Sequence, residues 1–220
     1  MSERFQFRGC SLLRESLGLH AEGERQLLER LETVPADSIY HHTVACLLRR
    51  SVHATPFPDD FASWVASEVR DLALAERLAL DSPFDFPDIE AFRERLIEVL
   101  DDHLSALSFS PRPLIGQPFY FLRGHLEAVP LGLEAHDLAS FRLALAQADD
   151  SAVYYHVVEA IGRLGNPRGD FAAWLEDSLG LVELARGIQE IDPFVLSLGD
   201  VRQRILEAVD GALGAPEARR

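Results

Sequence analysis

The chain has 220 residues, of which 47% are apolar, and this is enough to bury a substantial core in one domain or two. Its formal charge is −15, from 36 acidic and 21 basic residues, and such a surface repels phosphate backbones, which argues against a nucleic-acid partner. No run of 18 uncharged apolar residues occurs and the first eight residues carry charges, so we expect a cytoplasmic protein with no membrane partner.

Apolar spacing predicts helices along most of the chain. In chain order, the clearest helical segments lie at residues 61–69, 92–104, 153–164, 171–179 and 201–213, with apolar side chains at intervals of three and four. No stretch alternates with period two for long enough to demand a strand, and residues 5–7 and 119–121 are the only hints of one. The sequence therefore predicts an all-α fold.

The two halves of the chain are copies of each other. Three motifs of the first half return in the same order in the second half, 114, 110 and 109 residues later: Ile39-Tyr40-His41-His42 as Val153-Tyr154-Tyr155-His156, Asp60-Phe61-Ala62-Ser63-Trp64-Val65 as Asp170-Phe171-Ala172-Ala173-Trp174-Leu175, and Phe92-Arg93-Glu94-Arg95-Leu96 as Val201-Arg202-Gln203-Arg204-Ile205. We predict a first helical repeat at 1–109, a Pro-rich linker at 110–118, a second repeat at 119–214 and a disordered tail at 215–220. Each repeat is expected to be a helical bundle of about five or six helices, and the two are expected to pack with pseudo-twofold symmetry.

Two absences from the composition exclude particular chemistries. All basic residues are Arg, so Schiff-base chemistry, a P-loop lysine and a lysine general base are excluded. Cys10 and Cys46 are the only cysteines and neither belongs to a CxxC motif, so the thiols do not provide a structural zinc site. We expect Cys46 to be a small buried residue.

A polar set recurs in both copies and is the candidate site. Both histidines of this set occupy the apolar stripe of a predicted helix, so their rings should point inward. A buried polar group without a partner costs about 1–3 kcal/mol, and the aspartate that begins the next helix is the obvious partner. The set consists of Tyr40, His42, Asp60 and Trp64 in the first copy, and of Tyr154, His156, Asp170 and Trp174 in the second.

This set has a structural and a functional interpretation. In the first, each aspartate is a helix N-cap, each histidine ties two helices together and each tryptophan is a core residue. In the second, the sets line a pocket in which a histidine beside a carboxylate acts as a general base or metal ligand. None of the eight histidines has Glu three residues before it, the spacing of helical di-metal sites, so we expect no metal and no cofactor.

The same motifs resemble an uncharacterised family, DUF5752, whose members are duplicated in this way. The resemblance covers nearly the whole chain and includes Leu74-Ala75-Glu76-Arg77-Leu78-Ala79 and Ile191-Asp192-Pro193 besides the repeated motifs. The family usually has Asn before the Asp-Phe pair, where this chain has Asp59 and Gly169. The resemblance implies an architecture and a recurring residue set, and it implies no reaction.

Two functions are compatible with these observations. The first is a non-enzymatic binding or scaffold module that takes a protein partner or a small ligand in a groove between its halves, because no catalytic triad, metal motif or nucleotide loop is recognisable. The alternative is a hydrolase or transferase in which the Tyr/His/Asp sets serve as acid, base and orienting groups. A homodimer is compatible with either function.

Overall fold

A computed structural model of the protein describes residues 4–49, 57–107, 116–161 and 168–214. Within them the chain forms ten α-helices and one two-stranded antiparallel sheet. It divides into two compact units, which we name by their helices: the first-repeat unit is Leu12–His125, and the second-repeat unit is Met1–Ser11 together with Leu126–Arg220. Most of the predicted linker and all of the predicted tail lie outside the described residues.

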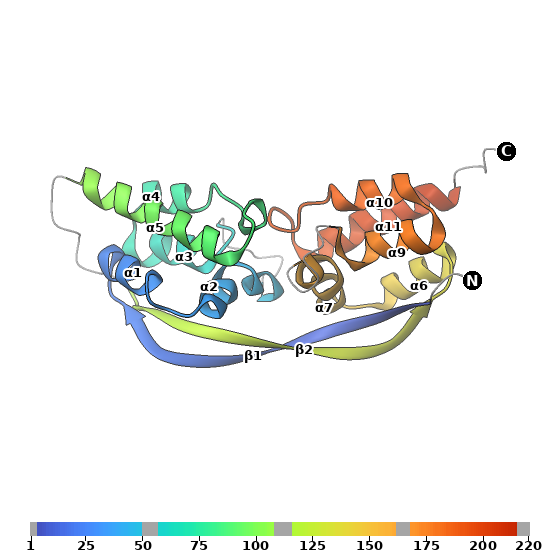
Figure 1. The fold of residues 1–220 in the computed structure, drawn as a ribbon, viewed down its shortest axis with the longest axis horizontal. Coiled ribbons are helices and arrows are strands. Elements are labelled where there is room, and N and C mark those ends of the chain that lie inside the picture. Colours follow the sequence, from blue (N-terminus) through green and yellow to red (C-terminus); the bar gives the residue numbers. More distant parts are fainter. Residues whose placement is uncertain (1–3, 50–56, 108–115, 162–167, 215–220) are drawn as a thin grey trace. The chain divides into compact units, whose positions relative to one another are not determined.

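The prediction of an all-α helical bundle is wrong, because the chain forms a sheet from two 17-residue strands, β1 (Phe5–Ala21) and β2 (Phe119–Ala135) (Figure 1). Both strands are buried only near their ends, and the residues in the middle of each are exposed. An alternating pattern arises only where one face of a strand is buried and the other is solvated. The pattern is therefore confined to a few residues at each end of the strands.

Each strand contributes its first residues to the unit that contains the helices of the other repeat. The first residues of β1, up to Ser11, belong to the second-repeat unit, and the first residues of β2, up to His125, belong to the first-repeat unit. Cross-strand ion pairs link Arg4 with Glu134 and Arg123 with Glu15. Each set of helices is thus completed by the start of the strand that precedes the other repeat in the sequence.

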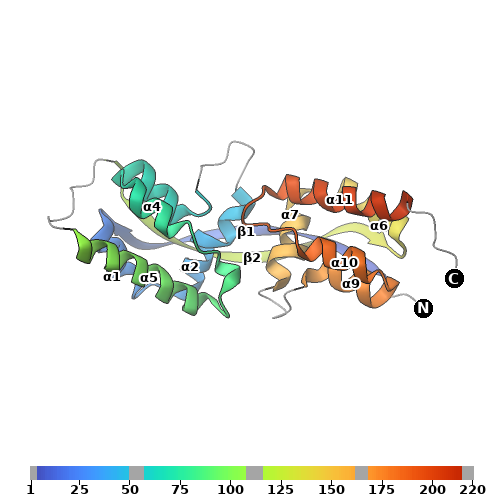
Figure 2. The same ribbon diagram turned by 90° about the horizontal axis from the view of Figure 1, so that it is seen from above.

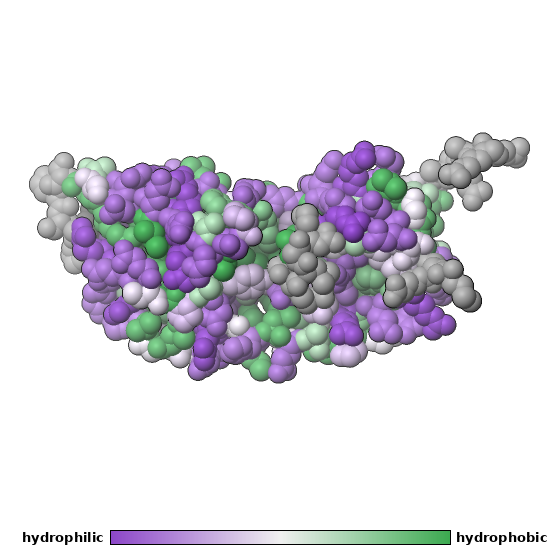
Figure 3. Space-filling view, viewed as in Figure 1, coloured by the Kyte–Doolittle hydropathy of each residue, from purple (hydrophilic) through white to green (hydrophobic). Residues whose placement is uncertain are grey.

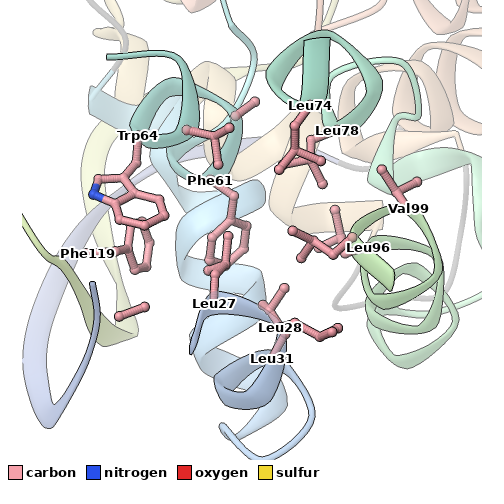
Figure 4. Packing of buried hydrophobic residues seen from close by; sticks show 14 of the residues in the cluster. Leu27, Leu28, Leu31, Phe61, Trp64, Leu74, Leu78, Leu96, Val99 and Phe119 are labelled. Carbon is pink, nitrogen blue, oxygen red and sulfur yellow. The ribbon is translucent and has the colours of Figure 1, made fainter. Parts of the chain in front are cut away.

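The first-repeat unit has five α-helices: α1 (Glu24–Leu31), α2 (Ala36–Thr43), α3 (Asp60–Trp64), α4 (Leu72–Leu78) and α5 (Ile89–Ala106). Short turns of other helical types lie between them: η1 (Ala45–Arg49), η2 (Val65–Val69) and η3 (Pro83–Asp85). Helix α5 packs against α1, α2 and α4 (Figure 2). Figure 4 shows the core of this unit, in which Phe119 of β2 packs among side chains of the helices, including Phe61 and Trp64.

The second-repeat unit repeats this arrangement. Its helices are α6 (Leu138–Gln147), α7 (Asp150–Val153), α9 (Gly169–Leu179), α10 (Val182–Gln189) and α11 (Leu198–Gly214), with a π-helical turn, η4 (Tyr154–Glu159), directly after α7. Helix α11 packs against α6, α7 and α10, as α5 does against its counterparts. Phe5 and Phe7 of β1 lie 5.5 to 6.1 Å from Phe141 and Phe171, measured between ring centroids.

Hydrophilic residues cover most of the face of the molecule shown in Figure 3. Among the described residues, no helix combines the length and the apolar character that crossing a membrane requires.

Candidate functional site

His42 ties a helix to the start of β2 and to the next helix. Its ring lies on α2 and is 3% exposed. Nδ1 is 2.8 Å from Oδ2 of Asp60, and Nε2 accepts a hydrogen bond from the backbone N–H of Leu122 at 3.0 Å. Because Nε2 accepts that bond, the ring proton lies on Nδ1, which donates to the carboxylate.

His156 makes the same arrangement in the second-repeat unit. Its Nδ1 lies 2.8 Å from Oδ2 of Asp170, and its Nε2 accepts the backbone N–H of Arg8 at 2.8 Å. The ring is again 3% exposed, although it lies on the π-helical turn η4 rather than on an α-helix. The expectation of inward-pointing histidines paired with the two aspartates is confirmed.

The electrostatics of the first site hold its histidine neutral. Burial lowers the pKa of His42 below its ordinary value, against the opposing effect of the Asp60 carboxylate. Burial by itself raises the pKa of Asp60, but the hydrogen bond from His42 and the charge of Arg49, whose Nη2 lies 2.6 Å from the carboxylate, outweigh it and lower the pKa. The site therefore contains an ionised aspartate between a neutral imidazole and a guanidinium.

Phenylalanines at the start of each strand cover the histidine rings. The centroids of Phe119 and Phe5 lie 4.7 and 4.8 Å from the rings of His42 and His156, respectively. The two tryptophans of the predicted set extend these clusters, because Trp64 lies 5.7 Å from Phe119 and Trp174 lies 5.5 Å from Phe5.

The other members of the predicted set have more ordinary places. Trp64 also donates its indole N–H to the backbone oxygen of Gln117 at 2.7 Å. Tyr154 is a fully buried core residue, whereas Tyr40 is half-buried.

The aspartates are not the N-caps that the sequence favoured. Asp59 caps α3 by accepting the N–H of Ala62 at 2.8 Å, which leaves the neighbouring Asp60 free to bind His42 and Arg49. In the second repeat, Asp170 is the second residue of α9 and lies inside the helix. The side chains that meet the histidines therefore come from the first turn of each helix.

Sequence reasoning missed the strand side of the site. Ser38, one turn before His42, donates its hydroxyl to the backbone oxygen of Leu122 at 2.8 Å, so this one strand residue is held through both its N–H and its C=O. The signal was present in the sequence, because Phe-x-Phe at 5–7 returns at 119–121 with the 114-residue spacing of the Tyr-x-His motif.

His41, the neighbour of His42, is a separate feature of the first-repeat unit. It is fully buried, and neither ring nitrogen has a hydrogen-bond partner in the part of the chain that the structure describes. Burial, together with the nearby His42 and Arg49, lowers its pKa to about 4. A Cβ on Gly124 would lie 2.7 Å from Nδ1 of His41, so the strand backbone is close to the imidazole.

The geometry of the His–Asp pairs favours a structural role over catalysis. A general base must have a lone pair within reach of the substrate proton. The Nε2 lone pair of each repeated histidine instead accepts a backbone N–H, and Nδ1 faces a carboxylate. Among the described residues, no three His, Cys, Asp or Glu side chains gather in a way that could hold a metal ion.

The fold and this site define a duplicated protein in which each set of helices holds the start of a strand through a His–Asp pair. The family described as "Family of unknown function (DUF5752)" matches residues 2–210, so the chain belongs to that family, as its motifs indicated. It is similar to the solved structure of OrfY from Thermoproteus tenax, with 28% sequence identity, a TM-score of 0.80 and coverage of 97% of both chains. No curated protein matches the chain.

Proposed function

We propose that this protein is a non-enzymatic binding or scaffold module that acts on a protein partner. The observation that carries the proposal is that the ring nitrogens of both repeated histidines are engaged inside the fold, by an aspartate on one side and a strand N–H on the other. The repeated His–Asp pairs are thus used to hold a strand against helices. We infer that these side chains stabilise the duplicated fold and do not form a reactive centre.

The alternative, a hydrolase or transferase, requires one of these histidines to exchange protons with a substrate. That step would have to break the bond from Leu122 or Arg8 to Nε2 and leave a partly buried backbone N–H without an acceptor, at a cost of about 1–3 kcal/mol. Phe119 and Phe5 also lie against the two rings, so a substrate would have to displace them. Both costs favour the binding module.

The charge of the chain favours a partner with a basic surface. A net charge of −15 accelerates association with positively charged proteins and opposes association with acidic ones. The proposal therefore includes a salt dependence: the affinity for the natural partner falls as ionic strength rises, because screening weakens interactions between exposed charges.

Nitrogen NMR of the imidazoles tests the proposal. In the full chain, we expect His42 to remain a neutral Nδ1–H tautomer at pH values at which an imidazole with the ordinary pKa of about 6.5 is already protonated, because burial lowers the pKa of His42. Protonation of His42 at that ordinary pKa would instead favour the enzymatic alternative. Turnover of a hydrolase or transferase substrate that is abolished by His156→Gln without a loss of stability would overturn the proposal.

A further inference from the structure

We propose that residues 5–11 of β1, here called the leading segment, exchange between two copies of the chain, so that each copy completes the second-repeat unit of the other. Such an assembly is independent of the proposed function. The second-repeat unit is discontinuous, because Leu126–Arg220 is completed by Met1–Ser11, whereas the first-repeat unit is the continuous stretch Leu12–His125. Along the chain, the leading segment is therefore connected to the rest of the second-repeat unit only through the whole of the first-repeat unit.

The leading segment is held by contacts that any copy could supply. Phe5 and Phe7 are buried among the aromatic rings of the second-repeat unit, with Phe7 at 1% exposure. The N–H of Arg8 donates to His156, and the N–H of Cys10 donates to Oγ of Ser151 at 3.2 Å. Every one of these bonds forms equally well whether the segment and the site belong to one chain or to two.

Beyond Leu12, which is half-buried, the chain that follows the leading segment is exposed. Leu13, Arg14, Glu15 and Ser16 are all exposed, and the side chains of β1 become partly buried again only from Leu17 onward. An exposed connection between a segment and the rest of its chain is where exchange between copies has the smallest cost, since no core contact is lost in the connecting residues. The corresponding residues of β2, 119–125, differ from the leading segment, because they belong to the same continuous unit as α5, the helix that precedes them.

Concentration and salt should control the exchange. A tethered segment has a high effective concentration at its own site, so the closed monomer dominates in dilute solution and the exchanged dimer grows with protein concentration. The charge of −15 on each copy opposes the approach of two copies, so salt should raise the dimer fraction. This salt dependence is opposite in sign to that expected for the basic partner.

A disulfide trap tests the exchange, because Cys10 of the leading segment already lies against its site, with Sγ 3.5 Å from the backbone oxygen of Ser151. Two versions of the full chain are mixed, both with Cys46→Ala: one keeps Cys10, and the other carries Cys10→Ser and Ser151→Cys. After incubation at high concentration and in high salt, the mixture is diluted and oxidised with diamide. We expect a disulfide-linked dimer on a non-reducing gel, because position 151 of one version can meet Cys10 only from the other.

Two controls make either result decisive. A version with Glu183→Cys in place of Ser151→Cys carries an exposed thiol on α10 of the same unit and reports collisions; it should give a severalfold lower yield of dimer. A single chain with Cys10, Ser151→Cys and Cys46→Ala, oxidised while dilute, should lock as a monomer and stay monomeric when concentrated.

The outcomes separate cleanly. Equal yields at positions 151 and 183 would overturn the exchange, as would the absence of a linked dimer when the single-chain lock forms. Failure of the lock itself would overturn it too, because Cys10 would then not lie at Ser151. Protonation of His42 at the ordinary imidazole pKa in the NMR experiment would count against the proposed function and leave the result of the trap unchanged.

Discussion

Replacement of His156 by Ala is the most direct test of the His–Asp pair as a structural element. The substitution removes the acceptor of the Arg8 N–H and the donor to Asp170. Each buried polar group left without its partner costs about 1–3 kcal/mol, and loss of the ring that packs against Phe5 and Phe171 adds to this. We expect the free energy of unfolding to fall by roughly 3–5 kcal/mol in total.

Urea denaturation of the full chain, extrapolated linearly to water, measures this loss. His156→Gln, whose amide oxygen can still accept the Arg8 N–H, should lose about half as much, since one of the two bonds survives. His136→Ala changes an exposed histidine of the same unit and should stay within about 0.5 kcal/mol of the unchanged protein. A loss below about 1 kcal/mol for His156→Ala would refute the structural role.

Three further predictions follow from buried groups. The pKa of His41 is lowered from 6.5 to about 4, so below pH 6.5 the unfolded chain binds a proton that the folded chain does not. The free energy of unfolding should therefore fall with decreasing pH. In urea titrations, His41→Phe should reduce the slope of this fall by up to about 1.4 kcal/mol per pH unit. Gly124→Ala places a Cβ 2.8 Å from Leu12 and should cost about 1–3 kcal/mol by thermal denaturation, against about 1 kcal/mol for Gly132→Ala, which has open space but a φ of 69°. Burial, together with nearby acidic residues, raises the pKa of Cys10 to about 12, so iodoacetamide should label it at pH 8 about a thousandfold more slowly than an exposed thiol, and equal rates would contradict the docked leading segment.

The helices and the His–Asp pairs could be predicted from the sequence because both depend on local spacing. His42 and His156 stand in apolar stripes of period 3.6, and the repeat identified Asp60 and Asp170 as their partners. The N-cap prediction failed in the first repeat because two acidic residues are adjacent, and the cap needs the side chain that precedes the first turn, which is that of Asp59. It failed in the second repeat because α9 begins one residue before Asp170, at Gly169.

The strands could not be predicted in the same way. A strand buried only at its ends gives at most about five alternating residues at each end, too few to distinguish from a loop. The sequence also could not predict which unit receives the first residues of each strand. That assignment depends on contacts such as the one between Arg8 and His156, which are 148 residues apart. Similarity between repeats identifies which segments are equivalent and does not say which copy of a segment meets which set of helices.

The residues of the two strands nevertheless reflect which parts of each strand contact the helices. Aligned at a spacing of 114, β1 and β2 share several residues near both ends and differ through most of their middle. The shared end positions are Phe5 and Phe119, Phe7 and Phe121, Leu17 and Leu131, Gly18 and Gly132, Leu19 and Leu133, and Ala21 and Ala135. Most of these positions are buried or partly buried in a unit, and the glycine pair has positive φ values of 68° and 69°. The middle residues are exposed and need only remain extended. The duplicated feature is therefore the contact of a strand end with a set of helices, and the His–Asp pair is the polar part of that contact.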